Sequence, residues 1–194
     1  MKSNVCKIEK GARSLDGIII ESEKVARYNE LDHKQAMQLR LLCEELINML
    51  PSIVSSFSGD FWIENQEKSY ELCVKVSVEG MDITTRERLI NVSKNNKNSS
   101  VVGITGKIRA VFDYMAMGAE EPMVSPAGRY GFSSNIDFSQ LWSLNDYKTY
   151  VQGEGESTPE WDELERSIIV KIADDVLVGV KGKTVNVIIK KIFS

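Results

Sequence analysis

The chain has 194 residues, of which 42% are hydrophobic and 27% are charged, which is the composition of a globular protein and not of a disordered one. Its net charge of −4 and its lack of any lysine- or arginine-rich run argue against a surface that binds nucleic acid. No stretch reaches the roughly 18 consecutive apolar residues of a membrane span. Residues 1–10 also lack the apolar core of a signal peptide, so we expect a cytoplasmic protein without a membrane partner.

The first half of the chain predicts two helices followed by two strands. Apolar residues at helical spacing predict a helix over residues 14–29 and a second one over about 34–50, which Pro51 is expected to end. Residues 60–64 form a short strand candidate. Strict alternation of apolar and other residues predicts a strand over Tyr70–Val78, with one buried face and one mixed face.

The second half is expected to begin with a short helix over about 84–90, a mobile polar loop over 91–100 and an amphipathic helix over 107–117. An irregular excursion over 118–136, two further helices over 139–151 and 161–174, and a final hairpin over 176–193 are expected to follow. Four lysines lie along the hairpin, and we interpret them as protecting an exposed strand edge: Lys181, Lys183, Lys190 and Lys191.

This order of elements predicts an α/β protein of the α+β two-layer sandwich type. Sequential strands are joined by tight turns or distant returns, so a mostly antiparallel sheet with helices on one face is the simplest arrangement. We expect a single domain over residues 1–194, with a helical and irregular insertion at about 118–160.

Residue types that act as nucleophiles or zinc ligands are scarce. The three cysteines, Cys6, Cys43 and Cys73, are far apart and form no Cys-x-x-Cys pair, and Cys43 is expected to pack as a small hydrophobe. The single histidine, His33, follows Asp32, a predicted helix N-cap. One histidine argues against a Ser-His-Asp triad, a Cys-His pair or a multi-histidine zinc site.

The residue pair that points most directly to chemistry lies in the second predicted helix. Glu44 and Asn48 are four residues apart, which places both side chains on one face, one turn apart. Carboxylate and amide oxygens are hard ligands that suit a divalent cation. From the spacing alone, the simpler interpretation is that both belong to the solvated face of an amphipathic helix.

A second candidate site lies at the start of the 107–117 helix. Gly103, Gly106 and Lys107 form a Gly-x-x-Gly-Lys segment there, where free backbone N–H groups and the helix dipole attract phosphate. Glycines let the backbone approach a ligand closely, and Lys107 adds a positive charge. An ordinary junction between a loop and a helix explains the same residues equally well.

These features resemble the histidine-kinase-like ATPase superfamily, whose nucleotide domain is the Bergerat ATP-binding fold, and within it the anti-sigma-factor and serine-kinase branch. The resemblance covers roughly residues 14–117 and 161–193. Glu44 and Asn48 match the Asn box of that family. The resemblance implies that Asn48 ligates the Mg²⁺ of a bound ATP and that Glu44, as the catalytic residue, positions or deprotonates the attacking group.

The resemblance also implies roles for the glycines. Gly103, Gly106 and Lys107 match the second glycine box and would bind the phosphates of ATP, and the polar segment 91–100 would be the lid over them. Gly80 aligns with the first glycine of the first glycine box, Asp-x-Gly-x-Gly in the family, which follows the second strand.

Two functions follow from the resemblance. The first is an ATP- and Mg²⁺-binding regulatory protein similar to the anti-sigma-factor serine/threonine kinases; if active, it is an ATP-dependent protein serine/threonine kinase or an ATPase. The second arises because Val78 stands where the family has the aspartate that bonds to adenine. It is a degenerate, non-catalytic module that binds a regulatory protein. The aromatic residues of segment 118–160 either bind such a partner or anchor that segment, and a homodimer is a further assembly left open.

Overall fold

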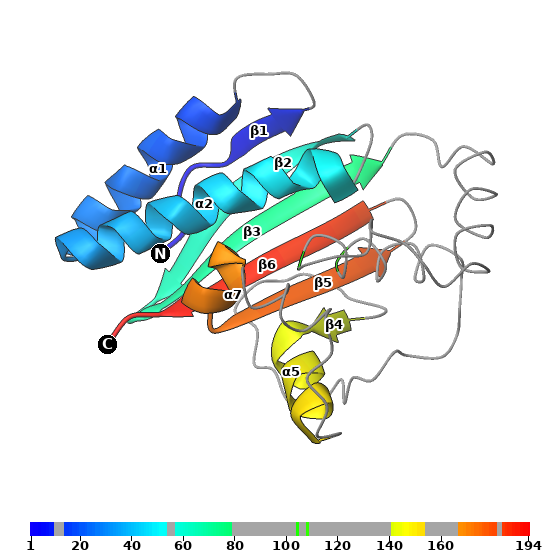
Figure 1. Cartoon of the computed structure of the whole chain (residues 1–194). Coiled ribbons are helices and arrows are strands. Elements are labelled where there is room, and N and C mark those ends of the chain that lie inside the picture. The colour runs from blue at the N-terminus through cyan, green and yellow to red at the C-terminus, as the bar shows by residue number, and fades with distance from the viewer. Residues whose placement is uncertain are drawn as a thin grey trace.

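The structure is a computed structural model that describes residues 1–9, 14–53, 57–78, 104, 108, 141–153, 167–181 and 184–194 (Figure 1). Predictions for 84–90, 91–100, 107–117 and 118–136 concern residues outside these ranges, apart from Ile108. In chain order the described elements are β1 (Cys6–Glu9), α1 (Ser14–Tyr28), α2 (His33–Ile53), β2 (Phe57–Gln66), β3 (Ser69–Val78), β4 (Leu141–Ser143), α5 (Leu144–Gly153), α7 (Ile168–Ile172), β5 (Asp175–Lys181) and β6 (Thr184–Ile192).

The strands form one sheet of six with the order β1-β2-β3-β6-β5-β4, and every neighbouring pair is antiparallel. The register aligns one apolar side chain from each of five strands in a row: Cys6, Phe61, Val74, Val187 and Val178. Helices together with an antiparallel sheet confirm the predicted α+β class. The two hairpins, β2–β3 and β5–β6, meet along the β3–β6 pair in the middle of the sheet.

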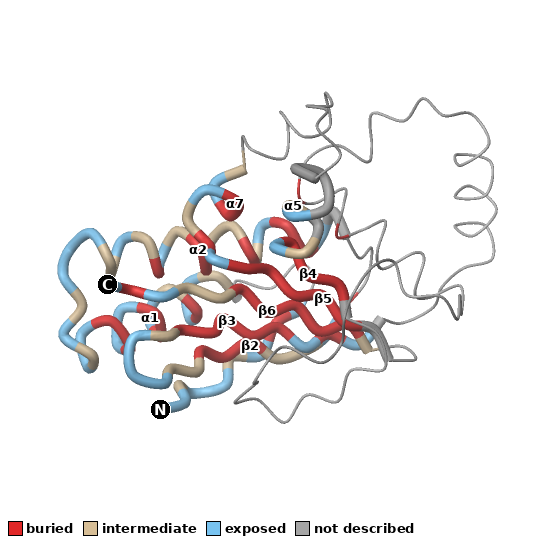
Figure 2. The backbone as a smooth tube through the Cα atoms, turned by 90° about the horizontal axis from the view of Figure 1, so that it is seen from below, coloured by how far each residue is buried: buried red, intermediate tan, exposed pale blue. Residues whose placement is uncertain are grey.

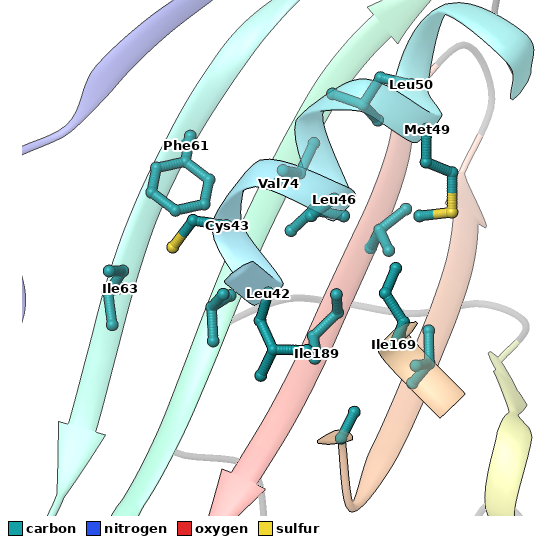
Figure 3. Close-up of a cluster of buried hydrophobic side chains, with 14 of the residues drawn as sticks. Leu42, Cys43, Leu46, Met49, Leu50, Phe61, Ile63, Val74, Ile169 and Ile189 are labelled. Carbon is teal, nitrogen blue, oxygen red and sulfur yellow. The ribbon is translucent and has the colours of Figure 1, made fainter. Parts of the chain in front are cut away.

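Three of the described helices, α1, α2 and α7, lie over one face of the sheet (Figure 1). Figure 3 shows Leu42, Leu46 and Leu50 of α2 above Val74 of β3 and Ile189 of β6. All five side chains are at most 1% exposed. Burying a leucine contributes about 1.5–3 kcal/mol relative to leaving it in water, so this face of α2 fixes the helix on the sheet. Of the helices in the described ranges, none has the length and apolar character needed to cross a membrane.

Part of the opposite face of the sheet is also buried. Trp62, Cys73, Ile188 and Leu177 follow one another across β2, β3, β6 and β5, and each is at most 8% exposed. Figure 2 shows that the central strands are buried along most of their length. The second face of the Tyr70–Val78 strand is mixed, as predicted, because Cys73 is buried there whereas Lys75 and Ser77 are exposed.

Helices α1 and α2 confirm the two predicted N-terminal helices, but α2 does not end at Pro51. It continues to Ile53. Pro51 is exposed and lies in the last turn, where its missing N–H removes one helical hydrogen bond only. At the other end, Asp32 is the predicted N-cap: its Oδ1 accepts a hydrogen bond from Gln35 N at 2.8 Å, and Gln35 Oε1 accepts one from Asp32 N at 3.1 Å.

Two predicted helices are wrong in part. The 139–151 helix is a short strand and a helix, because Leu141–Ser143 pairs with β5 and Ser143 Oγ then accepts a hydrogen bond from Asp146 N at 3.2 Å at the start of α5. Of the predicted 161–174 helix, residues 161–166 lie outside the described residues, Ser167 is extended (φ −64°, ψ 134°), and α7 ends at Ile172.

The hairpin is confirmed, but two of its four lysines, Lys190 and Lys191, lie on an inner strand and do not protect a sheet edge. Strand β6 lies between β3 and β5, and Lys190 Nζ is 3.4 Å from Glu71 Oε1 of β3. The strand at one edge is β1, which was not predicted, because its four residues contribute only Cys6 and Ile8 to the helix-covered face.

Candidate functional site

Glu44 and Asn48 lie on the side of α2 that faces away from the sheet. The residues on the opposite side of the helix, including Leu42 and Leu46, are fully buried, whereas the side chain of Glu44 is 29% exposed and Asn48 is exposed. Within the described ranges the Asn48 amide forms no hydrogen bond. The structure brings the pair to one accessible face, and this position fits both a solvated helix face and a site open to a ligand.

Glu44 has one charged partner, which lies one turn before it on the same helix. Arg40 Nε donates a hydrogen bond to Glu44 Oε1 at 2.9 Å, and Arg40 Nη1 is 3.4 Å from Glu23 Oε1 on α1. The hydrogen bond to Glu44 raises the pKa of Arg40 above its ordinary value. Because Arg40 is half exposed, solvent screens both ion pairs and they contribute little to stability.

Glu44 and Asn48 could hold a divalent cation only together with other ligands. Their Cα atoms are about 6 Å apart along the helix axis, at a rise of about 1.5 Å per residue. No group of three or more histidine, cysteine, aspartate or glutamate side chains in the described part of the chain is placed to bind a metal. Mg²⁺ usually binds to one or two protein oxygens plus phosphate and water. The pair alone therefore does not form a complete cation site.

The other predicted site residues, Gly80, Gly103, Gly106 and Lys107, lie outside the described residues. The structure does describe Ile104 and Ile108. Both have helical backbone, are at most 4% exposed, and belong to the same hydrophobic core as Leu46 and Leu50 of α2. The burial of Ile108 fits the amphipathic pattern predicted for residues 107–117.

Sequence reasoning missed a groove between α1 and α2. It has a volume of about 340 Å³. Its lining is apolar at Ala26, Leu31, Ala36 and Met37 and charged or polar at Glu23, Arg27, His33 and Arg40. Met37 is 51% exposed, and Tyr28, next in the chain to Arg27, is 75% exposed. Such large residues outside the core stripes of their helices are the sequence signal that could have indicated this surface.

A buried serine–aspartate pair joins β4, α5 and β5. Ser143 Oγ lies 3.1 Å from both carboxylate oxygens of Asp175, whose Oδ1 also accepts hydrogen bonds from the backbone N–H groups of Asn145 and Val176 at 3.0 and 2.8 Å. Burial raises the pKa of Asp175 despite these donors. These contacts connect the start of α5 to the sheet, so the pair is structural.

The cysteines of the described residues are free thiols without the features of a nucleophile. Burial raises the pKa of both Cys43 and Cys73 far above its ordinary value, so both stay protonated at neutral pH. Cys43 lies on the buried side of α2 and is completely buried, which confirms that it packs as a small hydrophobe (Figure 3).

The chain was compared with known families, sequences and structures. No protein-family model, no curated protein and no solved structure matches it.

Proposed function

We propose that this chain is a regulatory protein that binds ATP with Mg²⁺ and resembles the anti-sigma-factor serine/threonine kinases. The observation that carries the proposal is the position of Asn48. Its amide is exposed, one turn beyond Glu44, on a helix whose other side is buried against the sheet. Both oxygen-bearing side chains can therefore reach a ligand without any change in the packing of α2.

The arrangement of the described elements supports the proposal. Two helices are followed by two paired strands, a long segment and a final hairpin, and α1 and α2 cover one face of the antiparallel sheet. This is the order that the resemblance to the Bergerat fold implies. Ile104 and Ile108, which lie next to the proposed phosphate-binding residues in the sequence, are buried in the hydrophobic core that also contains Leu46 and Leu50 of α2.

The proposed roles follow from the chemistry of phosphoryl transfer, which depends mainly on charge neutralisation and positioning. Asn48 offers a neutral oxygen to Mg²⁺, which would neutralise phosphate charge. Glu44 positions or deprotonates the attacking hydroxyl or water. Gly103, Gly106 and Lys107 would bind phosphate, and Gly80 would lie on the adenine side. If the protein is active, it is a serine/threonine kinase or an ATPase.

A second candidate function is a non-catalytic module that binds a regulatory protein. The groove between α1 and α2, with Met37 half exposed and Tyr28 75% exposed nearby, favours this alternative. So does Val78, which stands where the adenine-binding aspartate of the family would be.

The test is thermal unfolding in the presence of Mg²⁺-ATP. Ligand at 100 times its dissociation constant stabilises the native state by about 2.7 kcal/mol. We expect Asn48→Ala to lose about half of this stabilisation, as a tenfold weaker affinity implies, and Asn48→Asp to keep most of it, because aspartate also offers an oxygen. Lys34→Ala, at an exposed position of the same helix, is the matched control and should respond like the wild type.

Two outcomes would count against the proposal. If ATP, ADP and GTP all leave the unfolding temperature unchanged, nucleotide binding is wrong and the protein-binding module stands. If Asn48→Ala responds fully to Mg²⁺-ATP, the role of Asn48 is wrong. Transfer of radiolabelled phosphate to a protein partner, with Glu44→Gln as the inactive variant, then separates a kinase from a nucleotide sensor.

A further inference from the structure

Arg40 of α2 contacts a residue of α1 and also Glu44 of the Glu44–Asn48 pair. Arg40, Glu44 and Asn48 follow one another at four-residue spacing, so they form one stripe along α2. Arg40 has two carboxylate partners: Glu44 Oε1 at 2.9 Å on its own helix and Glu23 Oε1 at 3.4 Å on α1. The side chains of Arg40 and Glu23 are each 50% exposed.

We infer that Arg40 is a positioning residue that holds Glu44 while the nucleotide site is empty and moves to Glu23 when Mg²⁺ and nucleotide bind. This inference rests on the proposed nucleotide site. Oε1 of Glu44 is occupied by a guanidinium N–H, so Arg40 competes with any metal-bound or proton-donating group for the same oxygen. An exposed i,i+4 ion pair is weak and therefore exchanges partners without disturbing the helix.

Because the carboxylate of Glu23 is a second partner, Arg40 can exchange its contact with Glu44 for one with Glu23. Glu23 and Arg40 both line the groove between α1 and α2. Loss of the Glu23 contact would leave Arg40 on Glu44 alone, and loss of Arg40 would free the Glu44 oxygen.

The test is isothermal titration of the full chain with ATP, with Mg²⁺ and separately with EDTA. Removing Arg40 as Arg40→Gln should tighten Mg²⁺-ATP binding by about two- to threefold, the size expected for one exposed ion pair, and leave binding in EDTA unchanged. Simple loss of a positive charge near phosphate would instead weaken binding in both conditions. Arg40→Lys, which keeps the i,i+4 ion pair, should restore an affinity near that of the wild type.

Two further variants test the path through Glu23. Glu23→Gln leaves Arg40 with Glu44 alone and should weaken Mg²⁺-ATP binding by about twofold. The double variant should match Arg40→Gln alone, because Glu23 acts only through Arg40. Lys34 forms no ion pair within the described part of the chain. Lys34→Gln therefore removes one positive charge from α2 without breaking an ion pair, and it should leave Mg²⁺-ATP affinity unchanged.

The results separate this inference from the proposed function. If the wild type binds Mg²⁺-ATP but Arg40→Gln binds it equally or more weakly, the role of Arg40 is overturned and the nucleotide site stands. If neither the wild type nor any variant binds a nucleotide, the proposed function fails and this inference fails with it.

Discussion

The structure predicts that the same substitution, glycine to alanine, has opposite effects at Gly59 and Gly17. Gly59 of β2 is paired with Val76 of β3. A Cβ at Gly59 would lie 2.2 Å from the backbone oxygen of Lys75, 2.8 Å from Val76 Cα and 2.9 Å from Val76 Cγ1. Because two of these atoms belong to the backbone, β2 and β3 would have to separate. A Cβ at Gly17 of α1 meets no atom within 4 Å.

These contacts set the expected size of each effect. Overpacking a core costs about 1–3 kcal/mol, and the backbone obstruction places Gly59→Ala at about 3 kcal/mol. For a chain of this size 1 kcal/mol shifts the melting temperature by about 2–4 °C, so the fall should be about 6–12 °C. Gly17→Ala replaces an exposed helix glycine by the best helix former. It should add about 1 kcal/mol and raise the melting temperature by about 2–4 °C.

Urea denaturation followed by circular dichroism, together with thermal melts, measures both variants. Gly17→Ala is the matched control, because it makes the same chemical change at an open position. A Gly59→Ala variant that unfolds at or above the wild-type midpoint would refute the register assigned to β2 and β3. A Gly17→Ala variant as destabilised as Gly59→Ala would refute the assignment of Gly17 to an exposed helix face.

Two further predictions concern backbone strain and pH. Glu30 has a φ of 53° at the end of α1, where Leu31 N donates to Ala26 O at 3.0 Å, so Glu30→Gly should stabilise the protein by about 1 kcal/mol in urea melts whereas Glu30→Ala should not. The pKa of Asp175 is raised in the folded state, so the stability it provides is complete below its unfolded pKa and is lost as the pH rises through its folded pKa. Asp175→Asn should therefore become more favourable relative to the wild type between pH 4 and pH 7, and a constant difference over that range would contradict this.

Long periodic segments of this fold could be predicted from the sequence, whereas features set by tertiary contacts could not. The stripes of α1 and α2 and the alternation of β3 determine their own structure, because each buries a continuous apolar face. Strand β4 forms only because Leu141–Ser143 finds a partner in β5, 30 or more residues later. Pro51 is tolerated because it lies in the last turn of α2. The local sequence pattern does not show that the helix continues for two residues beyond this proline.

In the candidate site, too, some features could be predicted from the sequence and others depend on tertiary contacts. The spacing of Glu44 and Asn48 was enough to place them on one face of α2, and the structure adds that this face is accessible. The Arg40 contact to Glu44 follows from the i,i+4 rule, but its second contact to Glu23 depends on how α1 packs beside α2. The groove between these helices is likewise a product of packing, and its signal in the sequence is limited to large side chains outside the core stripes, Tyr28 and Met37.

The most direct test of the proposed nucleotide site is calorimetric titration of Mg²⁺-ATP into the wild type and into Asn48→Ala. We expect one ATP per chain for the wild type. Loss of the Asn48 oxygen should weaken Mg²⁺-ATP binding by about tenfold, equivalent to about 1.4 kcal/mol, and should have little effect in EDTA. Absence of binding by the wild type, or equal affinities of the two proteins for Mg²⁺-ATP, would contradict the assignment of Glu44 and Asn48 to a nucleotide site.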